Sequence, residues 1–262
     1  MSIPHDLVIG GTRGLGRALV QLWDEQGHVV SVIGHRPPSE PDRNRTNVRY
    51  WTVDVTDRGA LSCALDELLE RHGPLNAAAC FQRYREGEDD WSGEFATSLT
   101  ATRQVIERTA EAFDKQGAHA IVIISSVASW LIADEQPLSY HVAKAALNQL
   151  VRWYAVTLGR RGIRVNGVSP GTVVKEESKS FYLEQEELQA LYRRVIPLGR
   201  MGTAEEIAQV AAFLCSSHAS FLTGQNLVVD GGLSLQWQET VARKFAALEQ
   251  APIARPSPAR SR

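Results

Sequence analysis

The sequence predicts a single α/β domain in which helices cover both faces of a doubly wound, parallel, seven-stranded sheet. Short apolar runs alternate with longer segments of helical periodicity along the whole chain, which is typical of repeated βαβ units. The length of 262 residues matches the upper size range of one α/β domain. Hydrophobic residues make up 44% of the chain, so it has the material for a large core and does not resemble a disordered or collagen-like chain.

The strands are predicted where short apolar runs lie between turn-forming residues. These runs are Asp6–Gly10, Val29–Ile33, Arg49–Asp54, Leu75–Ala79, Ala120–Ile124, Arg164–Ser169 and Gln225–Val229. Helical spacing predicts helices at Leu15–Gln26, Asp57–Arg71, Trp91–Gln116, Tyr140–Gly159 and Ala204–Ser216. Suitable helix N-caps and C-terminal stops are found in Asp57, Thr203, Gly27, Gly73 and Gly117.

Three segments depart from this alternation. Arg36–Asn47 contains three prolines and five charged residues, which predicts a surface excursion rather than a full helix. Lys175–Arg194 is polar and helical; we interpret residues 175–196 as a lid over a pocket, with a solvated insertion as the alternative. Residues 1–235 then form the domain, and 236–262 form a C-terminal extension whose end, rich in proline and arginine, is predicted to be disordered.

Charge and cysteine usage limit the partners and the compartment. The formal net charge is −2, so the chain as a whole offers no positive field to nucleic acid or to an anionic membrane. Cys63, Cys80 and Cys215 are odd in number and widely spaced, which argues against both a disulfide framework and a metal site. The first residues lack the features of a signal peptide. We therefore expect a cytoplasmic protein with no nucleic-acid, membrane or metal partner.

A glycine-rich loop joins the first predicted strand to the first predicted helix. It reads Gly10-Gly11-Thr12-Arg13-Gly14-Leu15-Gly16. In this context glycines permit a tight turn and a close approach to phosphate, and the helix N-terminus favours negative charge. The sequence therefore predicts a Rossmann-type fold that binds a dinucleotide at this loop, and the alternative is a tight turn without a ligand. The predicted contacts are Gly10, Thr12, Arg13, Gly14, Leu15 and Gly16.

The end of the second predicted strand bears on the choice of dinucleotide. An acidic residue there would bind the ribose hydroxyls of NAD, but this chain has Gly34-His35-Arg36. Arg36, His35 and Arg13 instead favour a 2′-phosphate, since arginine binds phosphate through two hydrogen bonds. We predict NADP(H) rather than NAD(H). If both arginines are merely solvated, the preference stays open.

A Tyr-x-x-x-Lys pair points to proton transfer. Tyr140 and Lys144 are four residues apart in a predicted helix, so they share a face, and a nearby ammonium favours the deprotonated form of a phenol. Ser126 follows the fifth predicted strand at the sheet edge where such folds bind ligands, and its hydroxyl is suited to stabilise an oxyanion. The alternative is that Tyr140 only packs on the sheet and that Lys144 is solvated.

Together these residues resemble the short-chain dehydrogenase/reductase family over about residues 6–235. Gly10, Gly14 and Gly16 match its glycine loop, and Ser126, Tyr140 and Lys144 match its catalytic residues. Further matches are Asp54-Val55, Asn166 with Pro170-Gly171, Ile196–Gly202 with Glu205-Glu206, Thr223-Gly224-Gln225, and Val229–Gly232. The last three stretches are most similar to the acyl-carrier-protein ketoreductase branch.

The resemblance implies an oxidoreductase that interconverts a ketone and a secondary alcohol by hydride transfer, with Tyr140 as the proton donor or acceptor. It adds Asp54, Val55, Tyr140, Lys144, Pro170, Gly171 and Val173 to the predicted cofactor contacts. It also implies a small-molecule carbonyl or alcohol substrate and a homotetramer or homodimer. The predicted helix at Tyr140–Gly159 has apolar residues on more than one face, among them Trp153, Tyr154 and Leu158. Packing against the sheet needs only one apolar face, so the others favour a subunit interface.

The chain departs from the family pattern at three places. Cys80-Phe81-Gln82-Arg83 replaces Asn-Asn-Ala-Gly, Lys175 replaces a threonine, and Ser98 replaces the catalytic asparagine that holds a water in the proton relay. Ser98 either holds that water or leaves the relay weakened. These departures keep two alternatives open: a cofactor-binding partner subunit with altered or lost catalysis, and an enzyme that uses the cofactor for elimination or epimerisation.

Substrate contacts are predicted at the rim of the pocket. The candidates are Trp130, Gln136, His141, Phe181 and Tyr182, each with packing or surface exposure as its alternative. His141 is not expected to donate the proton, since adjacent helical residues do not face each other. Arg83 and Arg85 suggest an anionic or polar substrate.

Overall fold

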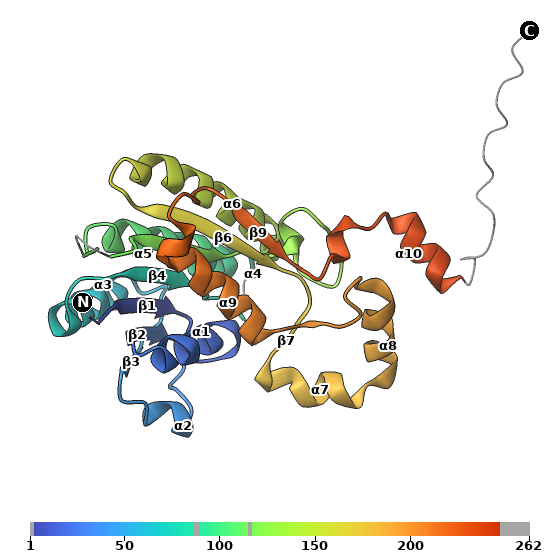
Figure 1. The fold of residues 1–262 in the computed structure, drawn as a ribbon, viewed down its shortest axis with the longest axis horizontal. Coiled ribbons are helices and arrows are strands. Elements are labelled where there is room, and N and C mark those ends of the chain that lie inside the picture. The colour runs from blue at the N-terminus through green and yellow to red at the C-terminus, as the bar shows by residue number, and fades with distance from the viewer. Residues whose placement is uncertain (1–2, 86–89, 115–116, 247–262) are drawn as a thin grey trace, which may run out of the picture.

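The structure is a computed structural model that describes residues 3–85, 90–114 and 117–246. Seven strands form one parallel sheet in the order β3-β2-β1-β4-β5-β6-β9, which confirms the predicted fold class (Figure 1). The strands are β1 His5–Ile9, β2 Val29–Gly34, β3 Val48–Thr52, β4 Ala77–Cys80, β5 Ala120–Ile124, β6 Arg164–Pro170 and β9 Asn226–Val229. The order reverses between β1 and β4, and open α/β sheets bind ligands at such a point.

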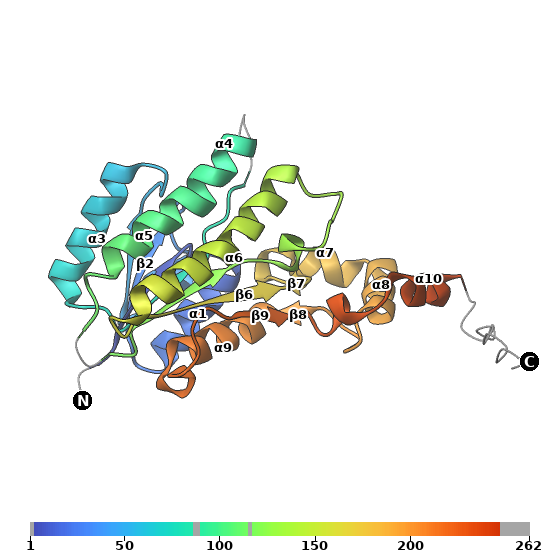
Figure 2. The same ribbon diagram turned by 90° about the horizontal axis from the view of Figure 1, so that it is seen from above.

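Helices cover both faces of the sheet (Figure 2). One face carries α1 (Gly14–Glu25) and α9 (Ala204–Cys215), and the other carries α3 (Arg58–His72), α5 (Ala101–Thr109) and α6 (Leu138–Gly159). The central strands are apolar throughout because both of their faces are buried. In β5, Val122 packs on the α9 side and Ile121 on the α6 side.

The helix predicted at Trp91–Gln116 is shorter and irregular. It consists of α4 (Asp90–Glu94), a π-helical turn η1 (Phe95–Thr100) and α5, which ends at Thr109. The helix ends early because the following residues pair with the chain before β4: Leu75 N–H donates to Ala112 O at 2.8 Å, and Asp114 N–H donates to Leu75 O at 2.8 Å. Gly117 is therefore not the helix stop, and residues 115–116 lie outside the described part.

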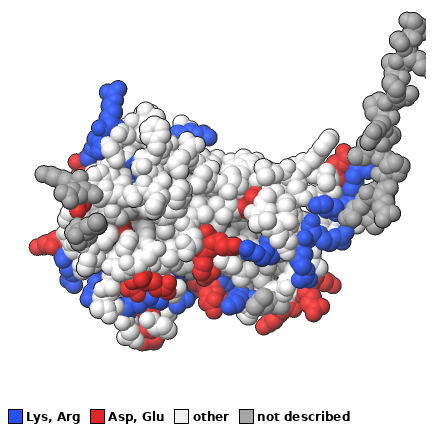
Figure 3. Space-filling model, viewed as in Figure 1, with Lys and Arg blue, Asp and Glu red and all other residues white. Residues whose placement is uncertain are grey.

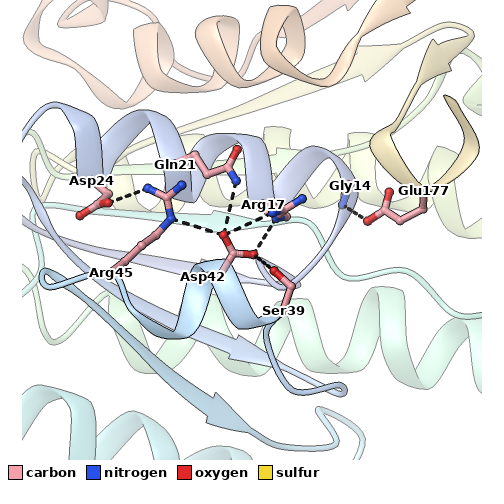
Figure 4. A network of polar contacts seen from close by, with 8 residues as sticks. All are labelled: Gly14, Arg17, Gln21, Asp24, Ser39, Asp42, Arg45 and Glu177. Atoms are coloured by element: carbon pink, nitrogen blue, oxygen red, sulfur yellow. Dashed lines mark hydrogen bonds and ion pairs between the residues drawn. The ribbon is translucent and has the colours of Figure 1, made fainter.

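The predicted excursion at Arg36–Asn47 contains one helical turn, α2 (Glu40–Arg43). Asp42 is buried and accepts hydrogen bonds from Arg17 and Gln21 of α1 and from Ser39 and Arg45 (Figure 4). Burial disfavours its ionised form, yet these hydrogen bonds, that of Arg17 first, lower the pKa of Asp42 below its ordinary value. The network anchors the excursion to α1.

The segment predicted as a lid is helical. It contains η3 (Glu176–Ser178), α7 (Lys179–Glu184) and α8 (Glu186–Val195). Two short strands that were not predicted, β7 (Val173–Val174) and β8 (Gly202–Thr203), pair in parallel at its base. The C-terminal extension begins with α10 (Gln238–Phe245), and its end, predicted to be disordered, lies outside the described residues. Single 3₁₀ turns complete the fold: η2 (Val127–Ser129), η4 (Ser217–Ala219) and η5 (Leu233–Leu235).

The predicted N-caps are confirmed by hydrogen bonds. The Asp57 carboxylate accepts from the N–H groups of Gly59 and Ala60 at 2.9 Å each. Thr203 and Glu206 form a reciprocal capping box at the start of α9. Within residues 3–85, 90–114 and 117–246, no helix is both long and apolar enough to cross a bilayer.

Candidate active site

A cavity of about 700 Å³ lies at the carboxyl ends of the central strands. Every residue predicted to contact the cofactor lines it, and so does Ser126. The cofactor set is Gly10, Thr12, Arg13, Gly14, Leu15, Gly16, His35, Arg36, Asp54, Val55, Tyr140, Lys144, Pro170, Gly171 and Val173. Of the predicted catalytic and cofactor-binding residues, only Ser98 is not in this lining. The fold thus brings together residues that are spread over more than half of the chain.

The glycine loop has the shape that a pyrophosphate requires. Gly10 has a φ of +78°, a conformation that L side chains rarely adopt. A Cβ added at Gly16 would lie 2.4 Å from the carbonyl oxygen of Gly10, so neither position accepts a side chain. The twelve-residue helix α1 begins at Gly14 and directs its first N–H groups into the cavity. The residues present therefore fit a dinucleotide.

The lid segment reaches this loop. The Gly14 N–H donates to Oε1 of Glu177 at 2.8 Å, so a lid carboxylate lies at the N-terminus of α1 (Figure 4). The side chain of Lys175 passes beside the same glycine, with its Cδ 3.3 Å from where a Cβ of Gly14 would be. Sequence reasoning noted Lys175 but missed Glu177, and no local pattern marked this contact.

Three cationic or titratable residues surround the adenosine end of the cavity. Arg13, His35 and Arg36 are exposed there, and no described carboxylate forms an ion pair with either arginine. Asp54 accepts hydrogen bonds from the backbone and hydroxyl of Thr56 at 2.9 and 2.7 Å, and the backbone hydrogen bond is the main reason why its pKa is low. The cavity thus offers positive charge near the end of β2.

The predicted catalytic residues come from two neighbouring elements. Lys144 on α6 is 3% exposed, and its Nζ donates to Ile124 O at 3.1 Å and lies 5.5 Å from the centroid of the Tyr140 ring. Ser126 follows β5 and caps η2, since its Oγ accepts from the Ala128 N–H at 3.1 Å. Burial lowers the pKa of Lys144 to about 8. This tyrosine, lysine and serine all face one cavity.

Ser98 lies in the π-helical turn η1, behind the cavity wall. It is 1% exposed, and its hydroxyl donates to Oε1 of Glu94, which is 3% exposed. Both α4 and η1 pack against α6, and the charge of Glu94 raises the pKa of Lys144, opposing burial. Sequence reasoning missed Glu94, although its spacing of four residues from Ser98 in a predicted helix was a usable signal.

The altered loop after β4 leaves the cavity open. Its backbone passes under the glycine loop, where a Cβ on Gly10 would lie 2.6 Å from the nitrogen of Gln82. Gln82 donates to the Thr102 hydroxyl at 2.5 Å, and the Tyr84 ring lies against Gly93. These contacts hold the loop on α4 and α5, and so the larger side chains do not fill the cofactor cavity.

A second cavity of about 490 Å³ lies next to the first. The two share Arg83, Tyr84, Arg85, Tyr140, Val173 and Lys175. Two predicted rim residues, Gln136 and Tyr182, line the second cavity, whereas Trp130 and Phe181 line neither and are exposed. The Arg83 guanidinium carbon lies 4.9 Å from the Tyr140 ring centroid, and its Nη2 donates to Gln136 at 3.2 Å.

His141 does not face either cavity. Its two ring nitrogens lie 2.8 and 2.9 Å from the carbonyl oxygens of Ala128 and Ala133, and these backbone hydrogen bonds raise its pKa. The residue therefore holds the loop before α6 instead of contacting substrate. No group of His, Cys, Asp and Glu among the described residues could hold a metal ion.

Comparison with known proteins shows the family. A family model described as Enoyl-(Acyl carrier protein) reductase matches residues 10–234. A 3-oxoacyl-[acyl-carrier-protein] reductase of Chlamydia pneumoniae is 30% identical over 245 residues, covering 87% of this chain and 96% of that protein. The 3-oxoacyl-[acyl-carrier-protein] reductase MabA of Mycobacterium avium is 32% identical over 237 residues, covering 87% and 89%.

Solved structures agree with this result. A short-chain type dehydrogenase/reductase from Mycobacterium ulcerans is similar with a TM-score of 0.80 and 28% identity, covering 90% of this chain and 92% of that chain. The predicted family is thereby confirmed. The chain belongs to the short-chain dehydrogenase/reductase family, and it is an oxidoreductase similar to the 3-oxoacyl-carrier-protein reductase branch.

Proposed function

We propose that this protein interconverts a ketone and a secondary alcohol with NADP(H), and that Tyr140 donates or accepts the proton. One observation carries the proposal: Ser126, Tyr140 and Lys144 line the same cavity as the phosphate-type glycine loop. The relatives, which include 3-oxoacyl-[acyl-carrier-protein] reductases, support carbonyl chemistry. The bound nicotinamide supplies or takes up the hydride.

The protein's own residues polarise the carbonyl and move the proton. The Ser126 hydroxyl, at the end of β5, donates a hydrogen bond to the carbonyl oxygen as negative charge develops there. Tyr140 delivers the proton to that oxygen. Lys144, held by Ile124 O beside the Tyr140 ring, stabilises the phenolate that is left. Its amino group also holds the cofactor ribose.

The preference for NADP(H) is supported by charge. Arg13 and Arg36 line the cavity without an ion pair to any described carboxylate, and β2 ends without an acidic residue. Arg17 does not contribute, because its side chain is bound to Asp42. A 2′-phosphate at this end of the cavity would find two guanidinium groups and His35.

The decisive experiment combines cofactor binding and turnover. Binding of NADPH and NADH is followed by fluorescence titration, and their oxidation is then measured against ketones and 3-oxoacyl thioesters. We expect a lower KM for NADPH than for NADH. Tyr140→Phe should reduce kcat by at least about 100-fold with little change in NADPH affinity, because only proton transfer is lost. A preference for NADH would refute the cofactor assignment.

The competing function is a cofactor-binding partner subunit, favoured by the replacement of the family asparagine by Ser98. Tight NADPH binding with no turnover of any ketone or alcohol, and no effect of Tyr140→Phe, would support it. Elimination or epimerisation would appear as product formation without net oxidation of NADPH. The buried hydrogen bond between Ser98 and Glu94 and the conventional placement of Tyr140 and Lys144 support catalysis instead.

We also place the protein in a reducing compartment, the cytoplasm. Cys63, Cys80 and Cys215 are all free thiols, and two of them are buried. Burial raises the pKa of the Cys80 thiol to about 12, so it stays protonated and unreactive at neutral pH. This arrangement agrees with a chain that does not depend on disulfides.

A further inference from the structure

Three cations stand between the two cavities. Arg83 and Arg85 come from the loop after β4, and Lys175 comes from the start of the lid segment. All three line both cavities, and so does Tyr140. A ligand whose carbonyl reaches Tyr140 therefore enters a space bordered by these positive charges.

The cations oppose one another. Burial, followed by the charges of Arg83 and Arg85, lowers the pKa of Lys175 to about 8. Arg83 and Lys175 also act with burial to lower the pKa of Lys144. Neighbouring positive charges disfavour each other's protonated form, and an anion bound between them stabilises that form.

The described carboxylates near Arg83 do not form an ion pair with it. No described carboxylate forms an ion pair with it or with Arg85. Of the acidic residues that line the second cavity, Glu94 accepts from Ser98 and Glu177 accepts from the Gly14 N–H. Asp90 is exposed at the start of α4. Among the described residues, therefore, no carboxylate is paired with Arg83 in this structure.

Arg83 lies at the catalytic end of the cavity. The aliphatic part of Lys175 passes beside Gly14, at the glycine loop. Arg83 instead lies over the Tyr140 ring, 4.9 Å from its centroid, and Gln136 accepts one of its N–H groups at 3.2 Å. The remaining N–H groups of the planar guanidinium can bind a carboxylate through two parallel hydrogen bonds.

We propose that the ketone substrate is an oxo acid, and that Arg83 binds its carboxylate while the carbonyl a few bonds away lies at Tyr140. The inference rests on the proposed function and adds the substrate class. Gln136 orients the guanidinium, so it is a positioning residue. A neutral ketone of the same size would leave this positive charge without a ligand.

Matched substrates test this assignment. Acetoacetate and levulinate are compared with their methyl esters, which differ mainly by the charge, at saturating NADPH. We expect wild-type kcat/KM to be higher for each acid than for its ester. Arg83→Gln should lower kcat/KM for the acids by about 10- to 100-fold and change that for the esters less than about threefold, because it removes a charge-assisted pair. Arg152→Gln, an exposed arginine of α6 bound only to Gln149 among described residues, is the matched control.

Other results would overturn the inference. Equal kcat/KM values for acid and ester in the wild type would show that Arg83 does not bind a substrate carboxylate. An equal decrease in kcat/KM for both substrates in Arg83→Gln would show the same. If Arg83→Gln raises the KM for NADPH and leaves the preference for acid over ester unchanged, Arg83 contacts the cofactor instead of the substrate.

A binding measurement separates this inference from the proposed function. Calorimetry of the two acids with the NADP⁺ complex does not need turnover. Binding that Arg83→Gln abolishes and Arg152→Gln preserves supports the carboxylate site even if no substrate is reduced, in which case only the proposed reaction fails. Absence of turnover together with absence of acid binding to the wild type overturns the inference.

Discussion

The buried carboxylate of Glu94 changes the expected effect of Ser98 on proton transfer. The family pattern has an asparagine where this chain has Ser98, and that replacement alone suggests a weakened relay. The structure adds Glu94 one helical turn earlier, hydrogen-bonded to Ser98 and electrostatically coupled to Lys144. A carboxylate at this place offsets the cost of keeping a lysine ammonium charged in a buried site.

At the residue scale, Glu94→Gln should shift the pH dependence of kcat. Glu94 raises the pKa of Lys144, whereas burial, Arg83 and Lys175 lower it to a net value of about 8. Without Glu94 the pKa falls, so the charged lysine is lost at lower pH and the alkaline limb should move down by roughly one unit. Glu94→Asp should restore part of the shift.

Glu70→Gln, on the exposed side of α3, is the control for the loss of a carboxylate. A pH profile of Glu94→Gln that overlays the wild type, with only total activity reduced, would mean that Glu94 acts through packing alone.

At the scale of elements, the lid segment touches the cofactor loop before any ligand is considered. Glu177 of η3 accepts from the Gly14 N–H at the start of α1, the place where a helix terminus would hold a pyrophosphate (Figure 4). A carboxylate and a phosphate compete for the same donor. We therefore expect residues 175–196 to release this contact when a dinucleotide binds.

Glu177→Gln should tighten NADPH binding by about 2- to 10-fold, because it removes the competing charge at the helix terminus. Fluorescence titration of NADPH at several salt concentrations measures the change. The neighbouring Glu176→Gln, whose carboxylate lies 3.8 Å from Lys179, should leave the affinity unchanged. Equal or weaker binding by Glu177→Gln would contradict the competition.

At the scale of the whole molecule, α6 leaves an apolar stripe uncovered. Val142, Trp153 and Val156 follow helical spacing and are 38%, 62% and 78% exposed. In Figure 3 the upper part of the face is mostly white, with blue Lys or Arg groups at its upper edge. Tyr154 and Leu158, which the sequence suggested for an interface, pack inside the chain's own core instead. Trp153 keeps its exposed position.

We expect a homodimer or homotetramer that uses this stripe. Trp153→Glu should reduce the molar mass measured by light scattering or sedimentation velocity, since it places a charge in an apolar interface. Ile3→Glu, at an exposed position before β1, should leave the mass unchanged. A monomeric wild type, or an intact oligomer in Trp153→Glu, would refute this role of α6.

Local patterns explain most of what was predicted correctly. The glycine loop, the Tyr140 and Lys144 spacing and the cap at Asp57 each depend on neighbours within a few residues. The alternation of apolar runs and helices was sufficient for the parallel sheet, because burial on both faces makes its strands apolar throughout. The early end of α5 was missed, since it depends on pairing with Leu75, far away along the chain.

The sequence by itself determined the fold class, the glycine loop and the placement of the proposed catalytic residues in one cavity, because these follow from short-range periodicity and chain order at a sheet edge. Only the tertiary structure decided that Arg83 lies over Tyr140, that Glu94 is buried beside Ser98, and that Glu177 reaches Gly14 across 163 residues. Such contacts depend on how the loops and residues 175–196 pack around the sheet, and short-range sequence patterns do not predict that packing.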